Sequence, residues 1–435
     1  MSRLPMGQPA PRTVPRPWEW LYNIVGTGMW AVTRARFDVQ VLGGPIPQVG
    51  RGQLWVATHR AETDVPLIGG LLTVRGGMWR RGAMRRAHFA ARDDLFEPGV
   101  VSAGLHLPGP LARIAWPLSP GPWLPRVRAH PIRRPSGLKL SQALCGLDAT
   151  LPLADVITPD VIEWFTQRAA AGGRTPPGTV GQARDAAFAK ELWQDVTVDD
   201  LDTPVGRGVW RAHVARAAGD LRRLIDLVGR GEPMVLFPEG RVSPDGGIGP
   251  VGGVVDLIVR RGAPTAILPV GIAYDPLRRR RATVAVSVGP PIAAGEGPIG
   301  PLVLDRLRRA MPITVGQVVA RELTAVAAST GPTLATRRLL ETLAHTHDLA
   351  RRDGRSFVRG LSSAGRRARS VAMALHTLQT RGLIEVLGTG EVRVDPDGVL
   401  RDPLLGRLAA EDRAVWQTGP DTPRSVGSRP HVRPS

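Results

Sequence analysis

Residues 54–64 read LWVATHRAETD, and the prediction of the fold starts from these residues. Leu54 to Thr58 form a nearly continuous apolar run, which is typical of a strand buried on both faces. A helix is expected over Pro66–Leu72, because Thr63 is a favourable N-cap and proline is tolerated in the first helical turn. A strand that passes through a short polar loop into a helix is the unit that builds parallel α/β sheets.

The same alternation continues on both sides of this stretch. Apolar runs predict further strands, and apolar residues at helical spacing predict further helices. The expected strands are Phe37–Leu42, Met234–Phe237, Ala266–Gly271 and Thr283–Val288, and the expected helices include His213–Val228 and Val251–Arg260. We therefore predict the α/β class, with a largely parallel mixed sheet flanked by helices over residues 37–310.

Residues 136–210 interrupt the alternation. Helical pieces on either side of the loop-forming stretch 172–178 predict a helical insert. Residues 1–16 are rich in Pro and Arg and predict a flexible basic tail, whereas the polar, Pro-rich residues 413–435 predict a disordered one.

Residues 311–412 predict a small, mainly helical C-terminal region. Its clearest helix is Val371–Thr380. The segments Leu383–Leu387 and Val392–Asp395 follow as strands of a terminal hairpin across Gly388-Thr389-Gly390.

The charge balance is strongly positive. The 435 residues include 57 Lys and Arg against 38 Asp and Glu, a formal net charge of +19. This favours anionic partners: phosphate head groups, an acidic membrane surface, an acidic carrier protein or nucleic acid. Cys145 is the single cysteine, which excludes an intrachain disulfide and fits a reducing cytoplasm. Its apolar neighbours predict a buried thiol.

Residues 17–36 predict a helix that lies in a membrane interface. Trp18, Trp20 and Trp30 accompany other apolar residues, and arginines flank the segment. Aromatic residues with a basic fringe suit the head-group region, and the segment falls short of the run of about 20 apolar residues that spans a bilayer. A helix packed on the domain core is the alternative. We expect a peripheral or monotopic protein on the cytoplasmic face of the membrane.

His59 and Asp64 are the candidate catalytic pair. His59 follows a strand and Asp64 falls in the first turn of the next helix, so the chain can fold back and bring both side chains together. The carboxylate can then hold one imidazole nitrogen while the other accepts a proton from an alcohol. The alternative is a capping or core role for both residues.

Two further groups have candidate binding chemistry. Glu239, Gly240 and Arg241 follow the strand Met234–Phe237, where the acid can bind a hydroxyl, the cation a phosphate, and glycine allows close approach of the backbone. Arg134 ends the run Pro131-Ile132-Arg133-Arg134 and is a candidate phosphate ligand. Surface salt bridges or solvated charges are the alternatives. The pattern of Cys and His residues suggests no metal site.

Taken in order, these motifs resemble the phospholipid/glycerol acyltransferase family, which includes lysophosphatidate and glycerol-3-phosphate acyltransferases. Its four sequence blocks are matched over residues 20–290 by His59 with Asp64, Pro131 to Arg134, Phe237-Pro238-Glu239-Gly240, and Leu268 to Ile272. The third block matches letter for letter. The departures are Pro131 where the family usually has Phe, Arg128 where it usually has Gly, and Val242 where it commonly has Arg.

The resemblance implies acyl transfer without a covalent acyl-enzyme. His59 would deprotonate the acceptor hydroxyl as it attacks an acyl thioester, and Asp64 would orient the ring. Glu239 and Gly240 would help to bind the glycerol part of the acceptor. Arg134 and Arg241 would bind its phosphate.

The implied reaction, in phospholipid biosynthesis, is acylation of the hydroxyl of 1-acylglycerol-3-phosphate. The co-substrate is acyl-coenzyme A or acyl carrier protein, and no cofactor is expected. Glycerol-3-phosphate is the alternative acceptor, favoured by the pair His59-Arg60. Because the insert 136–210 lies between the second and third blocks, it either caps the active site and shapes an acyl-chain pocket or is a peripheral elaboration.

A nucleic-acid-binding protein is the alternative of another class. Helix Val371–Thr380 precedes a hairpin and follows Arg366, Arg367 and Arg369, an order that resembles a winged-helix module. Aromatic residues that could stack on bases are not interleaved there, and the four-block match in the first 290 residues outweighs this resemblance, so we expect no nucleic-acid partner.

Overall fold

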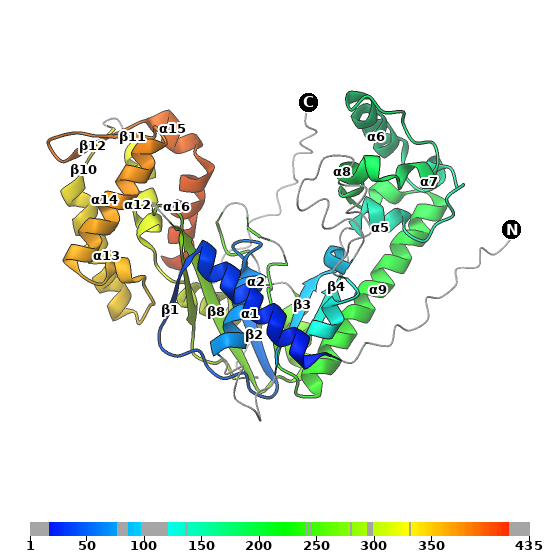
Figure 1. Ribbon diagram of the computed structural model, residues 1–435, viewed down its shortest axis with the longest axis horizontal. Helices are drawn as coiled ribbons and strands as arrows, with labels where there is room; N and C mark the ends of the chain where they lie inside the picture. Colours follow the sequence, from blue (N-terminus) through cyan, green and yellow to red (C-terminus); the bar gives the residue numbers. More distant parts are fainter. Residues whose placement is uncertain are drawn as a thin grey trace. The chain divides into compact units, whose positions relative to one another are not determined.

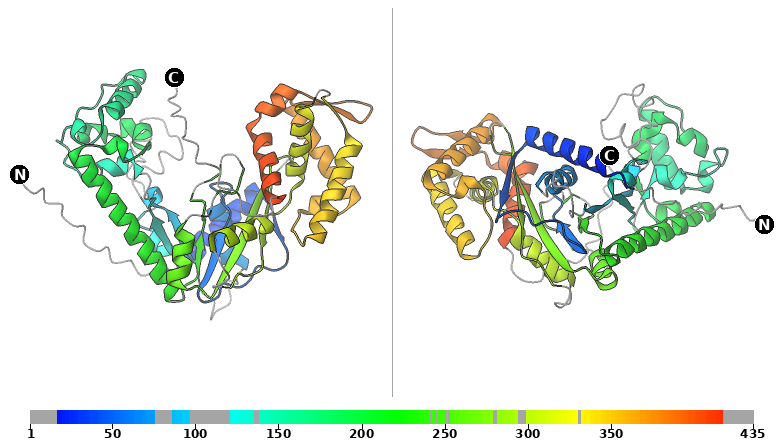
Figure 2. Two further views of the ribbon diagram at one scale, coloured as in Figure 1. Left: turned by 180° about the vertical axis from the view of Figure 1, so that it is seen from behind. Right: turned by 60° about the horizontal axis from the view of Figure 1, so that its bottom comes forward.

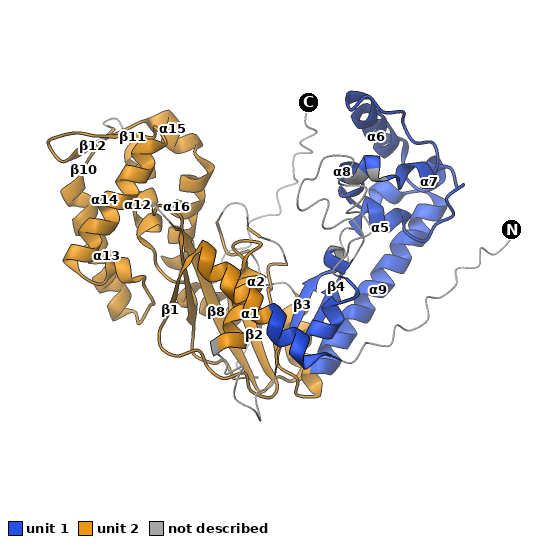
Figure 3. Cartoon of the chain, in the orientation of Figure 1, with its two compact units in different colours: residues 1–25, 88–227 blue, residues 26–87, 228–435 orange. Residues whose placement is uncertain are grey.

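The computed structural model (Figure 1) describes residues 17–75, 86–96, 121–134, 138–240, 242–243, 246–249, 251, 253–278, 281–293, 299–329 and 332–416. The chain forms two compact units, coloured separately in Figure 3. Unit 1 comprises residues 1–25 and 88–227, and unit 2 comprises residues 26–87 and 228–435. The expected basic tail and Arg241 lie outside the described residues.

The strands of unit 2 follow the order β1-β9-β8-β2-β7. Their bounds are Asp38–Leu42 for β1, Gln53–Ala57 for β2, Met234–Leu236 for β7, Ala266–Asp275 for β8 and Thr283–Val288 for β9. All neighbours in this order pair parallel except β8 and β9, which are antiparallel. The predicted α/β class with a mixed, largely parallel sheet is confirmed, and β2 buries Leu54, Val56 and Ala57 completely.

Helices lie on both faces of this sheet (Figure 2). The second half of α1 (Glu19–Arg36) and all of α2 (Asp64–Arg75) cover one face, and α10 (Gly253–Gly262) and α11 (Ile299–Ala310) cover the other. α1 and α2 pack closely, because a Cβ atom at Gly70 would fall 2.7 Å from the backbone of Trp30. Within the described part of the chain, no helix combines the length and apolarity needed to cross a membrane.

The insert has a hydrophobic core of its own within unit 1. Its helices are α5 (Leu140–Leu144), α6 (Pro159–Ala171), α7 (Val180–Ala183), α8 (Ala189–Leu192) and the start of α9 (Pro204–Gly229), and its two short strands are β5 (Leu138–Lys139) and β6 (Asp195–Val196). Leu140, Leu144 and Phe165 are fully buried in one cluster, against which Trp164 packs. The apolar residues of the insert therefore find a partner surface within the insert itself.

Cys145 is exposed, so the prediction of a buried thiol is wrong. Helix α5 ends at Leu144, whose side chain is buried, and the chain turns outward at the next residue. The apolar sequence around Cys145 reflects its buried neighbours.

The C-terminal region joins helices to a three-stranded antiparallel sheet of order β10-β12-β11. Its elements are α12 (Val315–Ala327), β10 (Thr333–Ala335), α13 (Thr336–Arg352), α14 (Ala364–Thr380), β11 (Ile384–Val386), β12 (Glu391–Val394), α15 (Pro396–Arg401) and α16 (Pro403–Trp416). β11 and β12 form the expected hairpin, whereas β10 was not predicted. Residues 413–416 are helical, contrary to the expected disordered tail, because Ala414 and Val415 are buried in the core of this region.

In unit 1, β3 (His88–Arg92) pairs parallel with β4 (Ala129–Ile132). Arg128, directly before β4, has a φ of +62°, a conformation that favours glycine. Arg128 Nη1 donates to His88 Nε2 at 2.9 Å, and His88 Nδ1 lies 2.7 Å from His130 Nε2. His88 is thus a neutral donor and His130 a neutral acceptor. Burial, with Arg223 and Arg128 nearby, lowers the pKa of His130 to about 4.

We expect the free energy of unfolding to fall as the pH drops from 6.5 to 4, with His130 contributing roughly 3 kcal/mol of the change. In this window the unfolded chain binds a proton at His130 and the folded protein does not, so the contribution is complete above pH 6.5 and lost towards pH 4. Urea unfolding at several pH values measures how the free energy of unfolding depends on pH. This dependence should be weaker in His130→Gln than in the wild type, and the same dependence in both proteins would contradict a neutral, buried His130.

Candidate active site

His59 and Asp64 lie together at the carboxyl end of β2. His59 Nδ1 is 3.1 Å from Asp64 Oδ2, and both side chains are buried. Asp64 Oδ2 also accepts the backbone N–H groups of Arg60 at 2.5 Å and Ala61 at 2.8 Å. An oxygen that accepts backbone donors in this way is a carboxylate acceptor, so Nδ1 of His59 carries the proton and Nε2 keeps a free lone pair.

Tyr274 completes the environment of Asp64. Its hydroxyl donates to Asp64 Oδ1 at 2.7 Å and lies 2.8 Å from Thr63 Oγ1. Burial and the neighbouring Asp64 raise the pKa of Tyr274, so the phenol stays protonated and acts as a donor. Asp64 therefore receives four hydrogen bonds, which fix the position of the carboxylate that holds the imidazole.

Glu239 ties the end of β2 to the loop after β7. Its Oε1 accepts the backbone N–H of His59 at 2.9 Å, and its Oε2 accepts that of Gly249 at 3.1 Å. Burial raises the pKa of Glu239 above its ordinary value, although Arg60 and these N–H groups oppose the shift. Each oxygen keeps a second lone pair, so the carboxylate holds the loop and can still accept a hydroxyl.

Phe237 and Gly240 of the Phe-Pro-Glu-Gly block also lie in this site. The centroids of the Phe237 and His59 rings are 4.9 Å apart. Gly240 has a φ of +64° in the turn that follows Glu239, a conformation that an L side chain rarely adopts. Replacement of Gly240 would therefore strain the turn that presents Glu239.

Helix α16 of the C-terminal region contacts Arg60, the residue that follows His59. A guanidinium nitrogen of Arg407, on α16, donates to the carbonyl of Arg60. Arg60 is fully buried and donates to the carbonyls of Gly246 and Gly247 at 3.0 and 2.9 Å. Arg407 also pairs with buried Glu411 at 3.2 Å, and burial raises the pKa of Glu411. The loop from residue 59 to residue 64 is thus supported by the sheet and by α16.

The candidate phosphate ligands are distributed over the chain. Arg134 is exposed after β4 in unit 1, where its carbonyl lies 2.7 Å from His213 Nε2. Its neighbour Arg133 instead forms a salt bridge to Asp220 at 2.6 Å, which is a structural role. Arg241 lies outside the described residues, whereas His59, Asp64, Glu239 and Gly240 all belong to unit 2.

A groove of about 510 Å³ in unit 2 is separate from this site. It is lined by the residues that follow β1 and β9, including Gly43, Gly44 and Gly289. β9 is antiparallel to β8, and β8 is parallel to β2, so the carboxyl end of β9 lies at the amino end of β2. The groove is therefore at the end of the strands opposite to His59. Among the described residues, no group of three or more His, Cys, Asp or Glu side chains could hold a metal.

Sequence reasoning did not identify Tyr274, Arg407 or Glu411 as site residues. Tyr274 lies in β8, but the strand predicted from the apolar run ended at Gly271. The one available signal was composition, because Tyr274 is one of two tyrosines in the chain. Arg407 and Glu411 are distant in sequence and belong to a helix with no recognisable motif.

Comparisons with known proteins give a partial structural likeness. No family model matches the sequence, and no curated protein sequence matches it. Among solved structures, the chain is similar to the 1-acyl-sn-glycerophosphate (LPA) acyltransferase PlsC from Thermotoga maritima, with a TM-score of 0.30 and 15% identity over 66% of this chain and 73% of that chain.

Proposed function

We propose that this protein is an acyltransferase that transfers a fatty acyl group from an acyl thioester to the hydroxyl of 1-acylglycerol-3-phosphate. The observation that carries the proposal is the His59–Asp64 pair at the carboxyl end of β2, 3.1 Å apart and tied to Glu239 of the Phe-Pro-Glu-Gly block. The order of the four sequence blocks supports the same reaction. The donor is acyl-coenzyme A or acyl carrier protein, and the reaction needs no further cofactor.

In the proposed mechanism, Nε2 of His59 accepts the proton of the acceptor hydroxyl. The hydroxyl oxygen attacks the thioester carbonyl, so that a C–O bond forms and the C–S bond breaks. The leaving thiolate takes the proton back from the imidazolium. Asp64 stabilises the imidazolium between these steps, and Tyr274 and the loop N–H groups keep Asp64 in place.

Acyl-transfer assays with glycerol-3-phosphate and lysophosphatidate side by side test the function and the choice of acceptor. Arg60, which with His59 formed the pair that favoured glycerol-3-phosphate, is fully buried and donates to two backbone carbonyl groups. We propose that its side chain makes no contact with either acceptor. We expect acyl transfer to lysophosphatidate at the higher rate. Transfer to glycerol-3-phosphate alone would select the alternative acceptor, and transfer to neither would contradict the proposal.

Arg134 and Arg241 are proposed to bind the acceptor phosphate, with Glu239 and Gly240 at the glycerol part. Arg134→Ala should raise KM for the phosphorylated acceptor roughly tenfold or more with a smaller change in kcat, because a charge-assisted hydrogen bond is lost in binding. Arg133→Ala is a poor control, since Arg133 is part of a salt bridge. Exposed Arg211 on α9 is the better one, and Arg211→Ala should leave KM unchanged. Equal KM values for Arg134→Ala and wild type would move the phosphate role elsewhere.

The proposed site of action is the cytoplasmic face of an anionic membrane, with α1 in the interface. Trp20, Ile24 and Val32 are 58, 62 and 67% exposed, and residues 20–33 carry no charge. Their spacing of four and eight residues places them on one side of the helix. In unit 1, Trp18 stacks on Trp20 with ring centroids 5.6 Å apart. Arg126 lies 4.3 Å from the centroid of Trp18, which combines aromatic and basic groups as interfacial segments do.

Ile24→Ser with Val32→Ser should lower affinity for anionic vesicles by roughly 10- to 100-fold, because each exposed aliphatic side chain would otherwise be buried in the membrane. Co-sedimentation with phosphatidylglycerol vesicles measures the effect. Leu400, 54% exposed on α15, provides the control substitution Leu400→Ser. The interfacial role of α1 is rejected if both proteins sediment like the wild type.

A further inference from the structure

The C-terminal region has the connectivity of a winged-helix module (yellow to red in Figure 1). Helix α12 leads through β10 into α13 and α14, and the hairpin β11–β12 follows α14. β12 lies between β10 and β11, and all pairs are antiparallel. In such modules the helix before the hairpin is the one whose outer face meets a partner.

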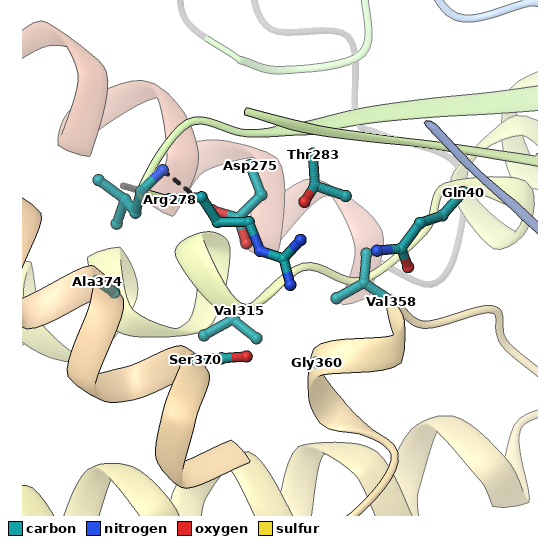
Figure 4. Close-up of a pocket in the computed structure, with 10 residues that line it drawn as sticks. Gln40, Asp275, Arg278, Thr283, Val315, Val358, Gly360, Ser370 and Ala374 are labelled. Atoms are coloured by element: carbon teal, nitrogen blue, oxygen red, sulfur yellow. Dashed lines mark hydrogen bonds between the residues drawn. The ribbon is translucent and has the colours of Figure 1, made fainter. Parts of the chain in front are cut away.

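One face of α14 packs inward. Ser370 and Ala374 line a cavity of about 10 Å³ that also contacts Asp275 and Gln40 (Figure 4). A cavity of this size holds at most one water molecule, so this face belongs to the core. Val371 and Leu378 are buried with it.

The opposite face of α14 is exposed, basic and built from small or polar side chains. Its exposed residues are Gly365, Arg366, Ala368, Arg369, Ala372, His376 and Gln379. Within the part of the chain that the structure describes, this face has no large exposed hydrophobic side chain. Protein interfaces depend on such anchors, whereas small residues beside arginines allow a helix to approach a phosphate backbone closely.

The chain around the start of α14 concentrates positive charge. Residues 351–369 contain seven arginines and one acidic residue, Asp353. Asp353 lies 3.6 Å from Arg355, and Arg355 is buried. Arg359, Arg366 and Arg369 are exposed and form no ion pair with another described residue. The charge is therefore available to an anionic partner.

We propose that the C-terminal region binds double-stranded nucleic acid, with the outer face of α14 directed towards the duplex. Arg366 and Arg369 contact phosphates on the flanks of a groove, while Gly365, Ala368 and Ala372 let the helix approach it. This revises the expectation that no nucleic acid is bound, which rested on the four-block match and on the lack of interleaved aromatic residues. Aromatic side chains that stack on bases are used to bind single-stranded nucleic acid. A helix that enters the groove of a duplex instead needs cationic side chains to contact phosphates and small side chains to approach closely. The inference is independent of the acyltransferase proposal.

The test is binding of the full-length protein to a fluorescent 30-base-pair DNA duplex, followed by anisotropy at several salt concentrations. Arg366→Ala with Arg369→Ala should lower affinity about 10- to 100-fold and reduce the salt slope of log K by about 2. The control, Arg211→Ala with Arg216→Ala, removes the same charge from exposed positions on α9 and should bind like the wild type.

Two outcomes would overturn the proposal. If both double variants lost the same affinity for the duplex, binding would depend on the total charge of the protein and not on α14. No duplex binding by the wild type, with binding to anionic vesicles or acidic carrier protein lost in the α14 variant, would assign this face to another kind of partner.

Hydrogen exchange of the wild type keeps the test decisive if the alanine variant unfolds. Addition of duplex should protect the amides of residues 364–380. Unchanged exchange in this helix at a saturating duplex concentration would also refute the proposal.

Discussion

Replacement of His59 by alanine is expected to lower the rate of acyl transfer by about 100- to 10,000-fold, the usual cost of losing a general base. The structure leaves Nε2 of His59 as the proton acceptor because Nδ1 donates to Asp64. The backbone of the loop should stay in place, since Glu239 and Arg407 bind the peptide groups of residues 59 and 60, and Asp64 keeps the N–H groups of Arg60 and Ala61 when the imidazole is lost. Initial rates with a thioester donor and lysophosphatidate measure the loss.

The control is His345→Ala, which removes an exposed histidine from α13 and should leave the rate unchanged. Thermal unfolding should show that His59→Ala remains folded, with a modest loss from the contact between the His59 and Phe237 rings. Near-normal turnover in folded His59→Ala would contradict the role of His59 as general base.

Asp64→Asn is expected to cost about as much, 100- to 10,000-fold, although it changes the side chain by little more than its charge. The amide oxygen can replace Oδ2 and accept the same three N–H donors, from His59, Arg60 and Ala61. The amide nitrogen would then face the hydroxyl of Tyr274, which can rotate from donor to acceptor. The loop geometry therefore survives, and the variant isolates the negative charge that stabilises the imidazolium.

Tyr274→Phe is the matched comparison, because it removes one hydrogen bond to Asp64 and keeps the charge. It should lower the rate by about tenfold or less, with a loss of roughly 1–2 kcal/mol in the free energy of unfolding. In the double variant His59→Ala with Asp64→Asn, the second substitution should add little, because Asp64 acts through His59. If the loss of rate in the double variant equalled the product of the two single losses, Asp64 would have a role independent of His59.

The residues of the candidate site were predictable where chemistry and secondary structure follow one another along the chain. His59 and Asp64 are five residues apart, and an apolar run before them marks the strand that places them at a sheet edge. The Phe-Pro-Glu-Gly block follows another apolar run in the same way. Its detailed contacts were not predictable, since Glu239 reaches the N–H of His59 only because β7 lies beside β2.

Arg60 and Arg407 illustrate the opposite case. Arg60 stands beside the catalytic candidate, and with His59 it formed the pair that favoured glycerol-3-phosphate, but its side chain is buried against the carbonyls of Gly246 and Gly247. Arg407 carries no motif, yet it binds the carbonyl of Arg60 from 347 positions further along the chain. Nothing local to either residue encodes the partner, because each contact forms only after distant segments have packed.

Local sequence patterns were sufficient to predict the strands and helices of the sheet, the position of His59 at a strand end and the basic character of the C-terminal helix. These depend on the spacing of apolar residues and on charge, which are local properties of the chain. By contrast, three features are apparent only in the packed fold: the hydrogen bond from Tyr274 to Asp64, the burial of the insert's apolar residues within the insert, and the exposure of Cys145. Burial and hydrogen-bond partners across the fold depend on which surfaces meet, and a contact such as that of Tyr274 with Asp64 joins residues 210 positions apart.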